Sequence, residues 1–223
     1  MPKLKIAKKS TWVDMTAFVD VAFLILSFFM LATKFKPPEV VKIENPKSVS
    51  SENQPEKDVF KVSFDKDGKV FVSFSSDTEG KGKARKTAEV LSQQKGLGLT
   101  PAEITTFVKF SVGGIGVPVS QLKSFLGFSD AEYKTFSQPG IPVQDSANNQ
   151  LNDYLNALLT GTGGRKPENV MLNGDNATKY PYFKNVLAAF KKNGIFSFKL
   201  ITALEGVPSG TPLYQKRKEA AAK

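Results

Sequence analysis

The residues whose types and spacing could do chemistry are Asp20, Thr16 and Ser27, because they interrupt a long apolar stretch. That stretch, Val13–Thr33, reads VDMTAFVDVAFLILSFFMLAT, and as a helix it spans about 31 Å, close to the thickness of a bilayer hydrocarbon core. A carboxylate inside such a span costs roughly 2.5 to 3.5 kcal/mol, so its presence needs a reason. Two reasons are open: the carboxylate binds and releases a proton, or it hydrogen-bonds a neighbouring helix.

The polar residues of this helix are expected to share one face. At 100° per residue, Thr16 and Ser27 fall within about 40° of Asp20. Asp14 lies about 120° away and near the end of the span, which makes it a candidate interface carboxylate that reaches water or a lysine. Lipid cannot satisfy a stripe formed by Thr16, Asp20 and Ser27, so we expect the stripe to face other protein. One helix cannot enclose it, and a partner subunit or further copies of the helix must complete it.

The composition excludes several classes of protein. Histidine and cysteine are both absent, which removes Ser-His-Asp and Cys-His catalysis, disulfides and Cys-based metal sites. We therefore expect a protein that is not an enzyme and that holds no metal or cofactor. The formal charge of +10 comes from scattered basic residues with no recognised nucleic-acid motif, so we do not expect a nucleic-acid partner.

The basic residues around the apolar stretch predict its orientation. Lysines are more numerous before it than after it, at positions 3, 5, 8 and 9 against 34 and 36. The positive-inside rule then places the N-terminus in the cytoplasm and the rest of the chain across the membrane. A cleaved signal peptide is the alternative, but no A-x-A-like site follows Val21–Ala32, and Asp14 and Asp20 stand between the basic start and the apolar core. We predict an uncleaved single-pass anchor.

Five segments follow from these patterns, and the largest is predicted to be an α+β domain. We expect a cytoplasmic tail (1–11), a transmembrane helix (12–35), a Pro- and Ser-containing linker (36–57), the folded domain (58–206) and a basic C-terminal tail (207–223). The linker fits a passive spacer and a tether that extends under load equally well.

Within the domain, alternating apolar residues over Val59–Phe74 predict a β-hairpin that turns at Asp65–Gly68. Further strands are expected at Asn169–Leu172 and Phe196–Ala203, with a turn at Asn173–Asp175. These elements predict a small mixed sheet that is covered by helices on one face. The expected helices are Lys83–Gln94, Pro101–Phe110, Leu122–Leu126, Asn148–Leu159 and Tyr182–Lys192.

The sequence Val13–Leu24 (VDMTAFVDVAFL) resembles the membrane segment of the ExbD/TolR biopolymer-transport family, which opens with a pattern like N/D-x-T-P-x-I/V-D-V. Asp14, Thr16 and Asp20 match its polar positions, whereas Ala17 stands where many members have proline. The layout of tail, helix, linker and small domain also resembles a longer member of that family. Weaker similarity extends over 140–143 and 175–182, and nothing is carried over between about 75 and 165.

The resemblance implies a function and a set of partners. It implies a proton-driven motor in the inner membrane with an ExbB-like multi-helix protein, a TonB-like periplasm-spanning protein and a homodimer of this chain within the hetero-oligomer. The domain would be periplasmic, and Asp20 would bind and release the proton that drives transport across the outer membrane. The alternative is a membrane-anchored scaffold or cell-wall-binding module of the TolR kind, which serves envelope maintenance.

Overall fold

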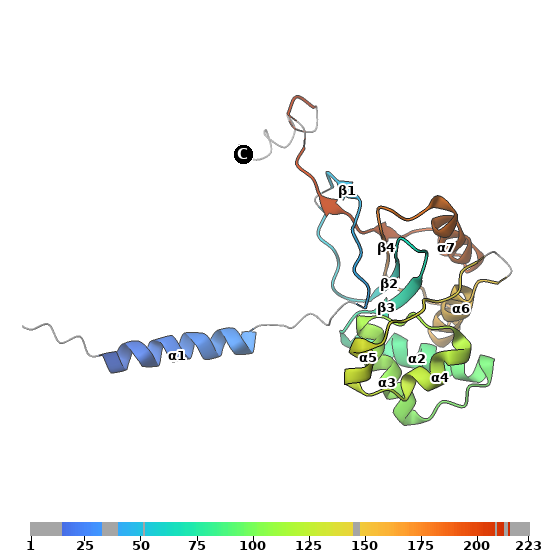
Figure 1. Cartoon of the computed structure of the whole chain (residues 1–223), viewed down its shortest axis with the longest axis horizontal. Coiled ribbons are helices and arrows are strands. Elements are labelled where there is room, and N and C mark those ends of the chain that lie inside the picture. The colour runs from blue at the N-terminus through green and yellow to red at the C-terminus, as the bar shows by residue number, and fades with distance from the viewer. Residues whose placement is uncertain are drawn as a thin grey trace, which may run out of the picture. The chain divides into compact units, whose positions relative to one another are not determined.

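The structure, a computed structural model, describes residues 15–32, 40–50, 52–144, 148–207, 209–211 and 214 (Figure 1). The chain forms two compact units, Met1–Pro37 and Pro38–Lys223. The predicted cytoplasmic tail (1–11) and most of the predicted basic tail (207–223) lie outside the described residues.

The described part of the first unit is a single helix, α1 (Met15–Ala32, 18 residues). It has no glycine or proline to interrupt it, and as an α-helix it is about 27 Å long. Its mean hydropathy of 2.2 makes it the one helix among the described residues that is long and apolar enough to cross a membrane.

The second unit begins its fold with the predicted hairpin, which is confirmed. β2 (Val59–Phe64) pairs antiparallel with β3 (Val70–Phe74). The turn is held by the Asp65 side chain, whose Oδ1 accepts hydrogen bonds from the backbone nitrogens of Asp67 (2.9 Å) and Lys69 (2.8 Å). Asp residues favour such turns because their short side chains bond their own backbone.

The predicted mixed sheet is also confirmed, with the strand order β3-β2-β4-β5. β4 (Asn169–Gly174) runs parallel to β2, and β5 (Lys199–Leu200) runs parallel to β4. The prediction of a turn at Asn173–Asp175 was wrong in its start, because Asn173 and Gly174 still pair with β2 and the turn begins only at Asp175.

The strand predicted over Phe196–Ala203 was too long, and the structure divides it. After Leu200 the chain leaves β4 and changes partner: β6 (Ala203–Leu204) pairs with β1 (Lys47–Ser48) instead. The backbone nitrogen of Ala203 donates to the Pro46 carbonyl at 2.9 Å. A strand that changes partner in this way cannot be read from alternation alone.

Helices fill the rest of the unit, and all five predicted helices occur with shifted ends. Thr100 is the N-cap of the second of them and Pro101 lies in its first turn, as the sequence indicates, and Glu103 completes a capping box that was not predicted. A further short helix, Asp130–Thr135, was not predicted. The helices are α2 (Thr78–Lys95), α3 (Pro101–Gly113), α4 (Val119–Leu126), α5 (Asp130–Thr135), α6 (Leu151–Gly161) and α7 (Tyr180–Lys192).

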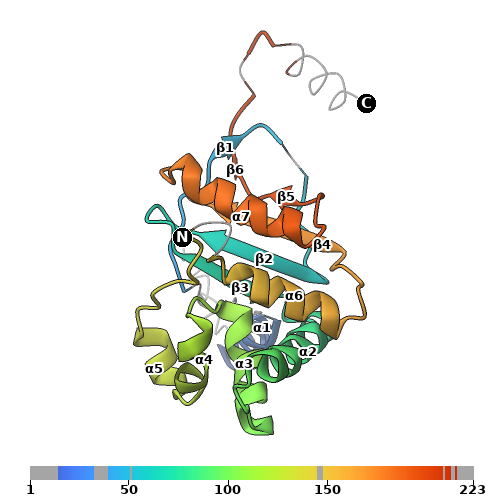
Figure 2. The same cartoon turned by 90° about the vertical axis from the view of Figure 1, so that its right-hand side faces the viewer.

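The hydrophobic core lies between one face of the sheet and these helices. In Figure 2, α7, α6 and α2 follow one another across that face. Phe60, Val62 and Leu172 are among the buried side chains that the sheet contributes to this core. All buried members of the core lie between residues 60 and 195, so the second unit has what it needs to fold without α1.

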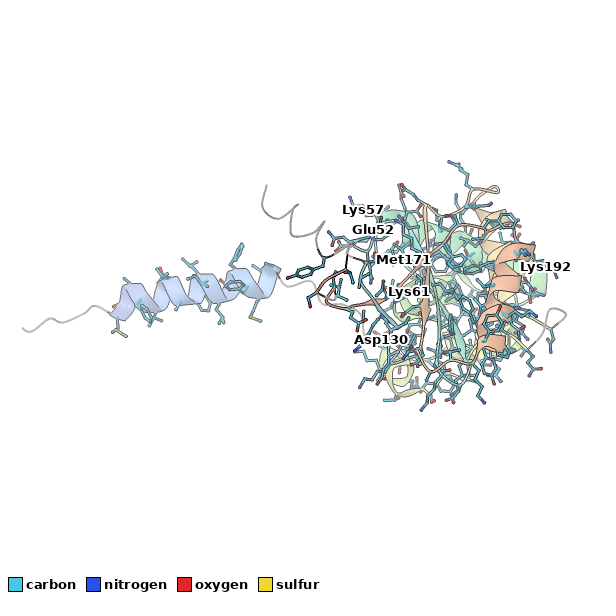
Figure 3. The ribbon with its side chains drawn as sticks, turned by 90° about the horizontal axis from the view of Figure 1, so that it is seen from above. Glu52, Lys57, Lys61, Asp130, Met171 and Lys192 are labelled. Atoms are coloured by element: carbon cyan, nitrogen blue, oxygen red, sulfur yellow. The ribbon has the colours of Figure 1, made fainter. Side chains whose placement is uncertain are left out.

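The other face of the sheet is covered by chain rather than by helices. We call residues 40–50 and 52–57 the strap; they fall within the predicted linker and belong to the second unit. Figure 3 shows Lys61 and Met171 on this face, on the opposite side of the sheet from Lys192 of α7. Part of the strap, β1, pairs with β6.

The segment between β3 and β4 also closes one edge of the sheet. Ile115 and Val72 exchange backbone hydrogen bonds of 2.8 and 2.9 Å, and the Ile141 nitrogen donates to the Val70 carbonyl at 2.7 Å. These bridges occupy the outer side of β3, which would otherwise present unpaired backbone groups.

The packing at Gly116 generates a stability prediction. A Cβ added there would overlap the Phe71 ring, whereas a Cβ at the exposed Gly82 in α2 meets nothing within 4 Å. We expect Gly116→Ala to lower the free energy of unfolding by about 1–3 kcal/mol through overpacking. Gly82→Ala should raise it by roughly 0.5–1 kcal/mol because alanine favours helix. Urea unfolding of a 38–223 fragment measures both, and equal effects of the two changes would contradict this packing.

Candidate functional site

The candidate site in the first unit is the carboxyl group of Asp20 on α1. Asp20 is the one charged residue in this helix and lies about 7.5 Å along the axis from Met15. Its side chain is exposed, and it has no hydrogen-bond or ion-pair partner among the described residues. The helix buries none of its residues, so its apolar surface and its carboxyl group are both available to other molecules.

The helical geometry of α1 places Thr16 and Ser27 on the same side as Asp20, because all three lie within one uninterrupted α-helix. Ser27 differs from Asp20 in one respect: its hydroxyl donates to the Leu24 carbonyl at 3.0 Å. A serine bonded to its own helix tolerates an apolar environment. The demand for a protein partner therefore rests on Asp20.

The remaining predicted site residue, Asp14, lies outside the described residues. Its interpretation as an interface carboxylate stays a prediction. So do the proton-binding role of Asp20 and the supporting roles of Thr16 and Ser27, since each concerns a state with a partner bound.

In the second unit, carboxyl groups act as caps and turn residues. Burial acts to raise the pKa of Asp77, but hydrogen bonds from Ser75 and from the backbone of Asp58 and Gly80 outweigh it and lower the pKa. The backbone N–H of Thr100 lowers the pKa of Glu103, and that of Ser129 lowers the pKa of Glu132. These acids are stabilised as carboxylates at helix starts, where backbone N–H groups lack partners.

Asp175, which follows a strand, is likewise a turn residue. Its carboxylate accepts hydrogen bonds from the backbone nitrogens of Ala177 (2.8 Å) and Glu44 (3.0 Å), and these lower its pKa. This confirms that Asp175 forms a turn, and it adds a contact that the sequence does not show, because Glu44 belongs to the strap.

None of these groups forms a catalytic constellation in the described part of the chain. There, no three Asp or Glu residues gather closely enough to hold a metal ion. Tyr133 and Tyr154 have pKa values raised by burial, but both hydroxyls donate to backbone carbonyls and serve the packing.

Sequence reasoning missed a buried ion pair at the start of β2. Asp58 is buried and its carboxylate accepts a hydrogen bond from the Lys83 ammonium group. In the sequence Asp58 directly follows a polar linker and Lys83 lies in a lysine-rich helix, so no local pattern indicates the pair.

Comparison with known proteins identifies a family. The protein-family model described as Biopolymer transport protein ExbD/TolR matches residues 7–205 of the chain. This range includes α1, the strap and the whole sheet. Searches of curated proteins and of solved structures gave no match.

The lowered pKa of Asp77 generates a prediction about acid stability. A carboxyl whose folded pKa is lowered stabilises the fold above its ordinary value near 3.8, and this contribution is lost as the pH falls through the folded pKa. We expect Asp77→Asn to reduce stability at pH 7 and to flatten its decline between about pH 4 and pH 2. Urea unfolding of the 38–223 fragment across that range measures this.

Gly82→Ala is the control, because it changes no titrating group and should shift the whole curve without changing its shape. An Asp77→Asn curve parallel to that of the wild type would contradict the assignment.

Proposed function

Because the chain belongs to the ExbD/TolR family of biopolymer transport proteins, we propose that it is the proton-coupled, energy-transducing subunit of an inner-membrane motor. Members of this family are transport accessory proteins rather than enzymes, and they work with ExbB- or TolQ-like and TonB- or TolA-like partners. The observation that carries the proposal is the Asp20 carboxyl group, which is exposed on a helix of near-bilayer length and has no partner among the residues that the structure describes.

The proposed topology follows from charge and length. α1 crosses the inner membrane once, with the lysine-rich N-terminus in the cytoplasm and the Pro38–Lys223 unit in the periplasm. Asp20 then lies in the half of α1 that is nearer the cytoplasm. Protons that move inward from the periplasm reach it across the other half of the membrane.

Asp20 is the proposed proton carrier, and the partner supplies the rest of the path. When apolar helices of an ExbB-like protein surround it, loss of water favours the neutral acid, and a water path that opens to the cytoplasm favours the carboxylate. Alternation between the two states changes the charge at the helix interface. The membrane potential adds about 2.3 kcal/mol per charge per 100 mV, enough over a few protons to drive a conformational step.

The periplasmic unit passes this work to a TonB-like protein that serves outer-membrane receptors. The alternative is a TolR-like scaffold that holds the envelope or the cell wall without protons. A passive anchor gains nothing from a carboxylate at the position of Asp20, which costs insertion energy, and this favours the motor.

Asp20→Asn tests the proposal because asparagine keeps the size and hydrogen bonding of the side chain but cannot lose a proton. In cells where this chain replaces the native copy, we expect energy-dependent uptake across the outer membrane to fall to the level of a deletion, while co-purification with the ExbB-like partner persists. Ser27→Ala should retain uptake, since the Ser27 hydroxyl already bonds its own helix.

Uptake at the wild-type level in Asp20→Asn cells would contradict the proposed motor function. Detergent sensitivity of cells that lack the chain altogether, with uptake unaffected, would favour envelope maintenance.

A further inference from the structure

Few of the described contacts hold the strap to the domain. Val40 packs against the core, and the Lys57 carbonyl accepts a hydrogen bond from Asn169 Nδ2 at 3.1 Å. The Glu44 nitrogen donates to Asp175 Oδ2 at 3.0 Å and its carbonyl accepts from Asn176 at 2.8 Å. The carbonyls of Pro46 and Ser48 accept from residues 203 and 205, each at 2.9 Å. β1 itself is two residues long, so this pairing is short.

The surface beneath the strap is partly polar and incompletely packed. A cavity of about 20 Å³ lies under Val40, Val41 and Ile43. Among the described residues, the side-chain oxygens of Asn45 and Asn173 are buried without a hydrogen-bond partner. Both defects reduce the cost of separating the strap from the sheet, because buried polar groups without partners regain water.

The strap is looser still beyond β1. Ser48, Ser50 and residues 52–55 border an open groove of about 590 Å³ whose other side is formed by β4, β5 and β6. A segment that encloses so much open space contributes little packing, and Glu52, Asn53 and Gln54 are all exposed.

In contrast to the strap, Asp58 is bound from two separate places, α2 with its N-cap and the start of β4. Its carboxylate accepts from the Lys83 ammonium group of α2 and, at 2.9 Å, from the Glu168 nitrogen just before β4. Its backbone nitrogen donates to Asp77 Oδ2 at 3.3 Å, and its carbonyl accepts from Asn169 at 3.3 Å. We call this set of contacts the Asp58 clamp.

The backbone at Asp58 is consistent with an enforced position. Its φ of 50° is positive, and among the described residues no other non-glycine residue has a positive φ. L-residues rarely occupy this region unless the surroundings hold them there. The next residue is held too, since the Val59 nitrogen donates to the Ser75 hydroxyl at 3.1 Å.

The Asp58 clamp is followed directly in the chain by β2, an inner strand of the sheet. β2 pairs with β3 on one side and with β4 on the other over its whole length. A pull on the N-terminal end of β2, directed along the strand, loads these hydrogen bonds together. A pull on the strap loads its few bonds nearly one at a time.

We propose that Asp58 is the load-bearing anchor of the periplasmic unit. Under tension from α1 the strap detaches and the clamp holds, so that the force enters the fold through β2. Detachment lengthens the connection by up to about 60 Å, since an extended chain spans roughly 3.3–3.6 Å per residue. The source of tension rests on the proposed motor function, but the mechanical order is a property of the unit itself.

Optical-tweezers pulling on the 38–223 fragment tests the proposal, with handles on the introduced cysteines Pro38→Cys and Lys179→Cys. The chain has no cysteine of its own. Lys179 lies near the end of β2, because the hydroxyl of its neighbour Thr178 donates to the Asp65 carbonyl at 2.9 Å, so the force runs along the strand. We expect two steps: a first step at low force of up to about 60 Å, and a second step at higher force when the fold opens. One step for strap and fold together would overturn the proposal.

Two variants locate the anchor. Asp58→Asn loses the ion pair with Lys83. In this variant β2 should separate from the sheet together with the strap, so that a single extension step replaces the two. Lys83→Gln should do the same if Asp58→Asn fails to fold. Gly116→Ala is the matched control, because it weakens the fold away from the clamp and should keep two separate steps.

Two separate steps at wild-type forces in both clamp variants would overturn the role of Asp58. That result would leave the proton-binding role of Asp20 untouched, and a failure of Asp20→Asn to block uptake would leave the two steps in place.

Discussion

A carboxyl group on an otherwise apolar helix is the constraint on which the rest of the molecule depends. Asp20 has no partner on its own helix, and lipid offers none. The hydroxyl of Ser27, on the same side of the helix, already donates a hydrogen bond to the Leu24 carbonyl. The need for a second protein therefore comes from the Asp20 carboxyl group alone. The proposed function meets this need across two subunits: the chain supplies the titrating group, and the partner encloses it.

The described polar groups of the second unit serve its packing and its turns. Its perturbed carboxyls cap helices and close turns, and its buried tyrosines satisfy backbone carbonyls. Ile115 and Ile141 occupy the outer side of β3, and the strap covers the sheet face that the helices leave open. The Asp58 clamp then separates a weakly held segment from a strand paired on both sides, an arrangement suited to a unit that is tied to a moving helix.

Local patterns predict much of this fold. Alternation predicts the hairpin of β2 and β3, and Thr100 followed by Pro101 predicts the start of α3. The division of the last strand was missed because Ala203 pairs with a segment more than 150 residues earlier in the chain. The Asp58–Lys83 pair and the contact of Asp175 with Glu44 were missed for the same reason. The residues of each pair are distant in the sequence, and no pattern in their neighbours indicates the contact. Asp20 could be singled out because its signal is local, a charge in a run of apolar residues, and its proton-binding role stays a prediction.

The most direct test of the account is proton flux through the purified complex of this chain with its ExbB-like partner in liposomes. With an imposed membrane potential, negative inside and oriented as in the cell, the wild-type complex should carry protons inward through Asp20, and the Asp20→Asn complex should carry none above empty liposomes. Equal flux through the two complexes would contradict the central claim, because the proton path would then not pass through this carboxyl group.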